Sequence, residues 1–360
     1  MIKLFQNLIL FFLLSLGTFY FLEKSIPKLN LSDKSVYYWK SRYMLIKSNK
    51  NIVFDNKKKF FTYHPNSTIH AKTYYYINNE FLKEYDYKFK TNNFGLSQAN
   101  NIFPKTPSII FLGDSFTEGQ GFGSWLDNLI ISKYQKINGG FVGTGFKQWE
   151  NFLNYLLNEN FNINKLIILF ISSDIERNVW NFSQNNLECL ENYNNCKKNQ
   201  IFYGMPENDS EILSFLHYVF LQRFKEENKN RLSFFFKNNF PNIRELIHKA
   251  RNQIRNFKKK TSQAKIDNAE TIARLTKKYN ENILFLHIPE KEEIFKNLMS
   301  KSGLDTKVII NKNNGKYIDL QKKCKFNLSD YYKFDGHFNS YGYIKLEKCI
   351  QNILKHEQLE

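Results

Sequence analysis

Short continuous runs of apolar residues recur along the C-terminal two thirds of the chain, each bounded by glycine, proline or polar residues. SIIFL begins at Ser108, KLIILFI covers residues 165–171, and ENILFLHI covers residues 281–288. Runs of this length, rich in β-branched residues, are typical of parallel strands that are covered on both faces. YQKIN, which ends at Asn138, and KYIDL at residues 316–320 predict two shorter strands.

Stretches in which apolar residues have helical spacing separate these strands. They are WLDNLIISKY from Trp125, a segment from about Lys147 to Asn158, EKEEIFKNLMSK from Glu290, and the closing stretch SYGYIKLEKCIQNILKH from Ser340. Strands that alternate with helices in this way pair in parallel, because each crossover needs a helix-length connection. The pattern therefore predicts an α/β fold with a doubly wound, flavodoxin-like parallel sheet.

The N-terminal pattern is different, because residues 4–22 form one apolar run preceded by a single charged residue, Lys3. At about 1.5 Å per residue, a helix of this run can cross the ~30 Å hydrocarbon layer of a membrane. We expect residues 1–24 to be an uncleaved transmembrane anchor, with the rest of this single-pass protein extracytoplasmic, in the periplasm or at the cell surface. A cleaved signal peptide and secretion are the alternative, although FYFLEKS offers no small-x-small cleavage site.

Between the anchor and the first strand, residues 25–105 carry Tyr- and Lys-rich segments interrupted by glycine and proline. We interpret them as an irregular juxtamembrane arm that leads into the domain. The domain itself is expected to span residues 106–355. Within it, residues 181–278 are far more than one crossover requires, and their helical stretches predict an insertion whose role is open.

The chain is strongly basic, with 52 Lys and Arg against 34 Asp and Glu and a formal net charge of +18. Such a balance raises the question of nucleic acid. Lysine dominates over arginine, however, and the main basic clusters, at residues 48–60 and 251–260, are separate and belong to no nucleic-acid-binding motif. We therefore expect a solvated surface and no nucleic-acid partner, with binding of anionic lipid or acidic glycan as the alternative.

The four cysteines form two pairs of sequence neighbours, Cys189 with Cys196 and Cys324 with Cys349. In an oxidising compartment they predict two disulfides between these nearest partners. Four cysteines allow three pairings, and four buried free thiols are the alternative. No CxxC pair or His/Cys cluster indicates zinc or haem, so we expect no metal and no cofactor.

The turns at the carboxyl ends of the strands are where an open α/β sheet binds its ligands. In FLGDSFTEGQGF, Ser115 lies two residues after Gly113, on the turn from the first strand to the next helix. A serine in this place has an exposed hydroxyl, nearby backbone N–H groups and a helix N-terminus that favours a developing anion. Ordinary capping of the helix is the alternative role.

A second unusual turn, KFDGHFNSYGY, carries Asp335 two residues before His337, directly ahead of the closing helix. Serine is a poor nucleophile until a base accepts its proton. Imidazole needs a carboxylate that selects its tautomer and stabilises its positive charge. A D-x-H turn supplies both groups from one loop.

In order, these blocks resemble the SGNH/GDSL hydrolase superfamily. GDSFTEG is followed by NGGFVGTG, then by a strand that ends in SSD, and finally by DGHFNSYG near the C-terminus. The resemblance covers about residues 92–355. The lead-in NNFGL before the first strand is similar to a segment of bacterial extracytoplasmic members.

The resemblance implies a role for each matching residue. Ser115 would be the nucleophile and would also donate its backbone N–H to the oxyanion. His337 would act as general base and then general acid, and Asp335 would orient it. Gly143 of NGGFVGTG matches the residue whose backbone N–H completes the oxyanion hole, with a simple turn as the alternative. Asp114 would shape the turn rather than catalyse.

The third block departs from the superfamily, which usually has Asn-Asp where this chain reads ISSDIERN. Ser173 stands at the position of the asparagine, a third oxyanion donor. Its hydroxyl is shorter than a carboxamide, so we expect weaker stabilisation of the oxyanion. Asn178 is the other candidate for this donor.

The function implied is that of a serine esterase that cleaves small O-acyl groups, with acetyl esters on cell-envelope glycans as the expected substrate, through an acyl-serine intermediate. An O-acyltransferase with the same residues is the first alternative, because it shares the first half-reaction. A non-catalytic glycan-binding or assembly protein is the second, supported by Ser173 alone. The expected partners are thus an acylated substrate and the membrane.

Overall fold

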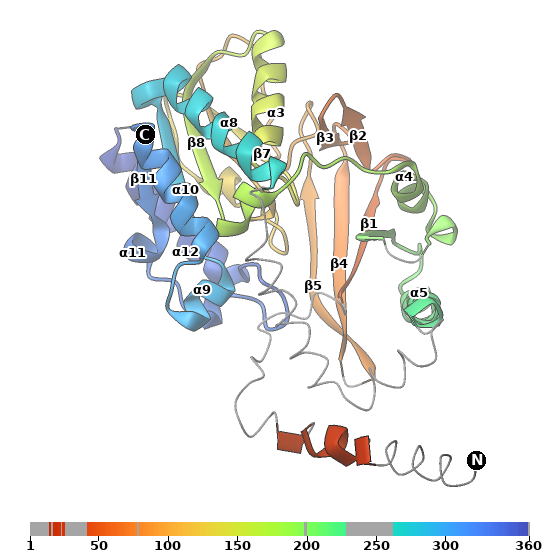
Figure 1. Cartoon of the computed structure of the whole chain (residues 1–360). Coiled ribbons are helices and arrows are strands. Elements are labelled where there is room, and N and C mark those ends of the chain that lie inside the picture. Colours follow the sequence, from red (N-terminus) through yellow and green to blue (C-terminus); the bar gives the residue numbers. More distant parts are fainter. Residues whose placement is uncertain are drawn as a thin grey trace, which may run out of the picture. The chain divides into compact units, whose positions relative to one another are not determined.

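The computed structural model describes residues 42–77, 79–197, 200–227 and 262–358, together with 14–15, 17–22 and 24–25. The chain divides into two compact units, and the strands and helices below belong to the unit formed by residues 36–216 and 262–360, except for residues 217–227 of one helix. This unit contains a five-stranded parallel sheet (Figure 1). Its strands are β6 (Ser108–Gly113), β7 (Gln135–Gly140), β8 (Ile163–Phe170), β10 (Ile283–His287) and β11 (Lys316–Asp319).

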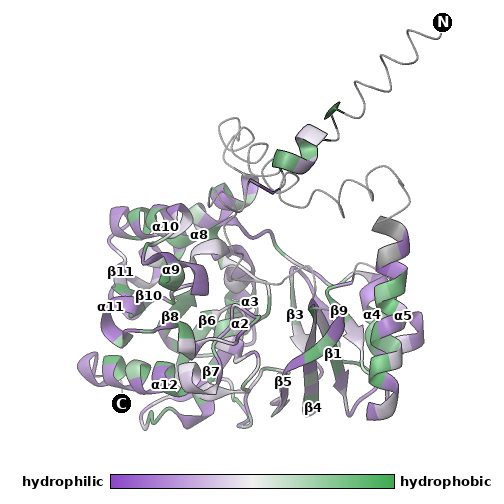
Figure 2. Cartoon of the chain, turned by 90° about the horizontal axis from the view of Figure 1, so that it is seen from below, coloured by the Kyte–Doolittle hydropathy of each residue, from purple (hydrophilic) through white to green (hydrophobic). Residues whose placement is uncertain are grey.

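Both faces of this sheet are buried, as the continuous apolar runs predict. Every residue of β6 and β10 is buried, and successive side chains point to opposite faces. Helices α3 (Phe146–Asn158), α8 (Gln263–Tyr279) and α10 (Lys301–Lys312) share one apolar cluster with the sheet. Helix α12 (Ser340–His356) shares the other. In Figure 2 the central strands are largely apolar. The α/β expectation is therefore confirmed.

The strand order is β11-β10-β8-β6-β7. The chain therefore lays β7 on one side of β6 and every later strand on the other side. In open parallel sheets the crevice for ligands lies where the winding changes direction, between such neighbouring strands. Here that place is the carboxyl edge of β6 and β8.

Residues 42–90 form strands, so the expectation of an irregular arm over residues 25–105 is wrong for this part. They contain β1 (Arg42–Ser48), β4 (Thr68–Ile77) and β5 (Glu80–Lys90), which with β9 (Phe202–Gly204) form a sheet of order β5-β4-β1-β9. The hairpin of β2 (Phe54–Lys57) and β3 (Phe60–Tyr63) accompanies it. The signal is in the sequence, because alternate residues of β5 are aromatic and buried: Tyr85, Tyr87 and Phe89.

The expected helical insertion at residues 181–278 is only partly helical. It contains α4 (Gln184–Glu191) and α5 (Asp209–Glu227), but also β9, which pairs in parallel with β1. Its last helix, α8, packs on the sheet as the crossover into β10. Residues 228–261 lie outside the described part of the chain.

Two further helices are shorter than expected. The stretch from Trp125 forms only a 3₁₀ turn, η3 (Trp125–Asn128). The stretch from Glu290 ends early as α9 (Lys291–Lys296), because Asn297 takes a left-handed φ of 49° that caps it, and a separate helix, α10, follows.

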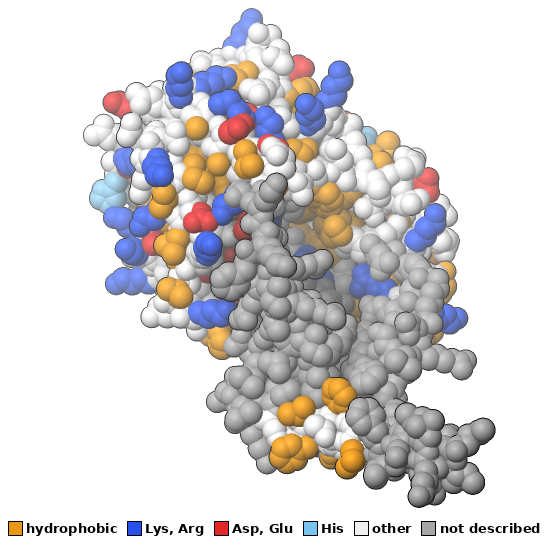
Figure 3. Space-filling model, viewed as in Figure 1, with side chains coloured by type: hydrophobic (Ala, Val, Ile, Leu, Met, Phe, Trp, Pro, Cys, Tyr) orange, Lys and Arg blue, Asp and Glu red, His pale blue; other side chains and the backbone are white. Residues whose placement is uncertain are grey.

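Most of the apolar run at residues 4–22 lies outside the described residues. Within the described ranges, no helix has the length and apolar character needed to cross a membrane. The anchor therefore stays a prediction. On the face drawn in Figure 3, lysine and arginine side chains are spread over the surface rather than gathered in one stripe.

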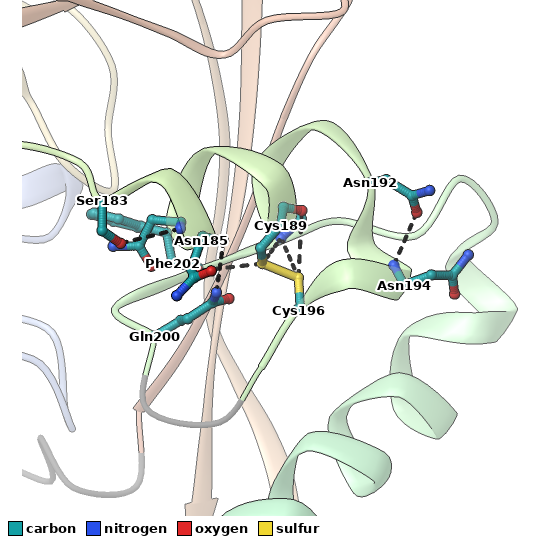
Figure 4. The surroundings of a disulfide bond; sticks show 10 residues. Ser183, Asn185, Cys189, Asn192, Asn194, Cys196, Gln200 and Phe202 are labelled. Atoms are coloured by element: carbon teal, nitrogen blue, oxygen red, sulfur yellow. Dashed lines mark hydrogen bonds between the residues drawn. A yellow bond between two sulfur atoms is a disulfide. The ribbon is translucent and has the colours of Figure 1, made fainter.

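Both predicted disulfides are present. Cys189 at the end of α4 bonds to Cys196 (Figure 4), and the backbone N–H of Gly204 in β9 lies 3.3 Å from each sulfur. Cys324 ends α11 (Leu320–Cys324) and bonds to Cys349 in α12. The second bond ties together two helices beside the five-stranded sheet.

We predict that replacing Cys324 and Cys349 together by alanine lowers the free energy of unfolding by about 3 kcal/mol, since this bond closes a long loop in the unfolded chain. The matched control is the double alanine variant of Cys189 and Cys196. That disulfide joins residues 7 rather than 25 positions apart, so its loss should lower the free energy of unfolding by less. Chemical denaturation measures both. An unchanged transition in the Cys324 and Cys349 variant would contradict the prediction.

Candidate active site

The turn after β6 holds Ser115 at the start of a single helical turn, α2 (Ser115–Glu118). Asp114 caps it, with its Oδ1 accepting a hydrogen bond from the Phe116 N–H at 2.9 Å. Gly113 has no room for a side chain, because an added Cβ would lie 2.4 Å from the carbonyl oxygen of Leu169. The strand and the turn therefore approach β8 closely, at the crevice position.

Ser115, His337 and Asp335 form one chain of hydrogen bonds. The Ser115 Oγ lies 2.7 Å from His337 Nε2, and His337 Nδ1 lies 2.6 Å from Asp335 Oδ1. The backbone N–H of His337 also points to Asp335 Oδ1, at 3.2 Å. Ser115 and His337 are each 5% exposed and Asp335 is 0% exposed. The structure thus brings the three predicted residues together, with the imidazole between hydroxyl and carboxylate.

The second oxygen of Asp335 is held by the four-stranded sheet. Tyr75 of β4 and Tyr85 of β5 donate their hydroxyls to Asp335 Oδ2 at 2.8 and 2.9 Å, and Arg42 Nε of β1 is 3.8 Å away. Burial by itself would raise the pKa of Asp335. The charges of His337 and Arg42 and the hydrogen bonds from His337 and Tyr75 outweigh burial and hold the pKa far below its ordinary value. The carboxylate is therefore ionised.

These three residues were missed by sequence reasoning. Arg42, Tyr75 and Tyr85 lie about 250 or more positions before Asp335 along the chain, and no motif links them to the D-x-H turn. Only the alternating buried aromatic residues of β5 mark the region as a half-buried sheet.

A second buried contact joins the hairpin to α2. The hydroxyl of Tyr63 in β3 donates to a carboxylate oxygen of Glu118, and the Ser97 hydroxyl donates to the Glu118 carbonyl at 3.1 Å. Burial raises the pKa of Glu118 to about 8, so this side chain is largely neutral at pH 7. Tyr63 and Ser97 thus hold the helical turn that begins with Ser115.

The candidate oxyanion residues line the same cavity as Ser115. Gly143, in the turn after β7, has a φ of 71°, and an added Cβ would meet the Trp180 ring at 3.1 Å, so both conformation and space favour glycine. Ser173 lies in the 3₁₀ turn η4 (Ser172–Glu176) after β8, and its hydroxyl donates to Glu290 Oε1 at 2.8 Å. Asn178 lines the cavity as well.

Asp114 has a further partner beside its capping role. The guanidinium Nη1 of Arg177 lies 3.0 Å from Asp114 Oδ2 and 3.0 Å from Asp174 Oδ1. Asp174 in turn accepts a hydrogen bond from the Ile171 N–H at 2.9 Å. This ion-paired group joins the turn after β6 to the turn after β8, which explains why an aspartate suits both blocks.

The cavity has a volume of about 740 Å³ and is lined by residues of β1 and β9 and by the turns that follow β6, β7 and β8. Its lining includes the triad residues Ser115 and His337. It also includes the apolar and aromatic side chains of Val142, Val179, Trp180, Ile201 and Phe202. Among the described residues, no group of three or more His, Cys, Asp or Glu side chains is arranged to hold a metal ion.

No family profile and no curated protein sequence matches the chain. Among solved structures, a protein from Lactobacillus plantarum shares 10% identity over 71% of this chain and 99% of its own, with a TM-score of 0.29. A protein from Bacillus subtilis shares 9% identity over 89% of this chain and 91% of its own, with a TM-score of 0.36. Likeness at this level supports no conclusion about function.

Proposed function

We propose that this protein is a serine esterase of the SGNH/GDSL type that cleaves small O-acyl groups, with acetyl esters on cell-envelope glycans as the substrate. The observation that carries the proposal is the buried chain of hydrogen bonds from Ser115 through His337 to Asp335, open to a cavity. O-acyl transfer shares the first half-reaction, and the alcohol that attacks the acyl-enzyme distinguishes the two.

In the proposed reaction, Ser115 Oγ attacks the ester carbonyl carbon while His337 Nε2 takes the hydroxyl proton. The tetrahedral oxyanion collapses, the leaving alcohol takes the proton back from Nε2, and an acyl-serine remains. In the second half-reaction, water attacks the acyl carbonyl carbon while Nε2 takes a proton from the water. The intermediate then releases the acid, and Ser115 Oγ takes the proton back from Nε2. Asp335 stays ionised throughout, which supports the proposal because an anionic partner stabilises the imidazolium formed in each half-reaction.

We also propose a sheet type and a location for the protein. The parallel sheet would be doubly wound and flavodoxin-like, and residues 4–22 would anchor the protein in a membrane with its domain outside the cytoplasm. The strand order supports the first point. The two disulfides support the second, because such bonds persist in oxidising compartments.

We predict that a fluorophosphonate probe labels the purified protein at Ser115 and that Ser115→Ala abolishes the label. Only a serine activated by a base reacts with this probe at an appreciable rate. Ser183→Ala is the control, because the Ser183 side chain caps α4 and is not among the residues that line the cavity, so labelling should stay in place. Peptide mapping by mass spectrometry identifies the labelled residue. Absence of label at any pH would contradict an enzymatic function.

We predict that Ser115→Ala and His337→Ala each remove nearly all hydrolysis of an aryl acetate, and that the double variant is little worse than either, since triad residues act as a unit. Asp335→Asn should lower kcat by about 10⁴-fold, because it favours the wrong imidazole tautomer. Steady-state kinetics tests both. Losses that multiply in the double variant would show that the residues act separately.

We predict that Tyr75→Phe and Tyr85→Phe each lower kcat about tenfold with KM nearly unchanged, because each removes one hydrogen bond to the Asp335 carboxylate. Tyr74→Phe is the matched control, since Tyr74 lies next to Tyr75 in β4 and points to the other face. Equal kinetics in all three variants would mean that the four-stranded sheet does not position the acid.

A further inference from the structure

The hydroxyl of Ser173 donates its proton to a hydrogen bond with Glu290, so the proton is not free for an oxyanion. Its Oγ lies 2.8 Å from Glu290 Oε1, and both residues line the cavity that holds Ser115 and Gly143. A serine hydroxyl has one proton to donate, and an ionised carboxylate can only accept. While Glu290 is ionised, the Ser173 proton is therefore directed to Glu290 and away from the substrate.

The same contact has the opposite polarity when Glu290 is protonated. The carboxylic acid then donates its proton to Ser173 Oγ, and the hydroxyl hydrogen of Ser173 becomes available to a group in the cavity. No heavy atom has to move, because both arrangements use the same 2.8 Å contact.

The surrounding contacts hold this pair in place. The Glu290 N–H donates to Glu293 Oε2 at 2.9 Å, and Glu293 Oε1 accepts from the hydroxyl of Ser172 at 2.6 Å. His287 Nε2 lies 2.9 Å from the same Ser172 hydroxyl. Two neighbouring serines of η4 are thus hydrogen-bonded to two glutamates after β10, and these contacts hold the backbone of Glu290 beside η4.

We propose that Glu290 is a positioning residue that acts through Ser173, its protonation deciding whether the Ser173 hydroxyl donates to the oxyanion of the acyl-transfer reaction. The inference rests on the proposed function, because it requires that Ser115 forms a tetrahedral intermediate. The inference adds the Glu290 carboxyl group, which belongs to none of the sequence motifs, to the proposed catalytic site.

The charges that face Glu290 come from four neighbouring segments. Glu293 of α9, Asp114 before α2 and Asp174 of η4 are acidic, whereas Arg177 after η4 is basic. Burial, helped by Glu293 and Asp114 and opposed by Ser173 and Arg177, raises the pKa of Glu290 to about 7. A raised pKa keeps the acid form below pH 7, so the donor is available there and is lost as the pH rises through 7.

The test compares the full-length protein with Ser173→Ala, using p-nitrophenyl acetate as the substrate. Activity is measured from about pH 5.5 to 9, a range that brackets the pKa of Glu290 at about 7. The ratio of their kcat values is the readout. Effects of pH that are common to both proteins cancel from the ratio. We expect a ratio of about ten or more at the acid end, which falls to about one at the alkaline end.

The same ratio is then measured with Glu290→Gln in both proteins. Glutamine does not titrate, so the ratio should no longer depend on pH. Glu292→Gln is the matched control, because Glu292 lines the same cavity but pairs with Lys296, and it should leave the pH dependence intact. If Glu290→Gln unfolds, as judged by circular dichroism, Glu290→Met serves as a second non-titrating variant of similar length.

A ratio that is flat with pH in the native background overturns the inference, and so does a pH dependence that survives in Glu290→Gln. Fluorophosphonate labelling of Ser115 separates these results from failure of the proposed function. If labelling persists and the ratio is flat, only the role of Glu290 is wrong. If no form is labelled, the esterase proposal fails and the inference fails with it.

Discussion

A fully buried carboxylate is the constraint on which the rest of the site depends. Asp335 has no exposed surface, and an ion removed from water must be compensated by charge and hydrogen bonds. His337 and its own backbone N–H satisfy one oxygen, whereas Tyr75 and Tyr85 satisfy the other, with Arg42 nearby. The turn that carries the acid therefore needs a second sheet against it.

This requirement explains why residues 42–90 are folded into strands rather than irregular. The four-stranded sheet brings hydrogen-bond donors to Asp335. The hairpin of β2 and β3 brings Tyr63 to Glu118, in the helical turn that begins with Ser115. The parallel sheet supplies the serine, the histidine and the aspartate. The four-stranded sheet supplies the tyrosines that hydrogen-bond to the aspartate, so two structural layers contribute to the site.

The sequence predicts the parallel sheet well, because buried parallel strands are continuous apolar runs that need no partner to be recognised. It also places Ser115, Asp335 and His337 in turns at one edge, and the structure brings them within hydrogen-bonding distance. The four-stranded sheet was missed because its strands are rich in lysine and tyrosine, and their alternation is easily read as polar loop. The bond of Ser173 to Glu290 could not be foreseen either, since it joins turns that only the fold makes neighbours.

The pairing of β9 with β1 has a consequence for how the chain is made. Strand β1 lies between β4 and β9, and β9 is contributed by residues 202–204, far later in the sequence. During synthesis, one side of β1 stays an open row of backbone donors and acceptors until this segment arrives. The opposite edge, β5, is guarded by outward charged residues such as Lys88 and Lys90, but β1 carries the buried apolar run of Met44, Leu45 and Ile46. We therefore expect a nascent chain that stalls before β9 to present an unpaired strand edge, the kind of edge at which strands of separate copies pair and aggregate.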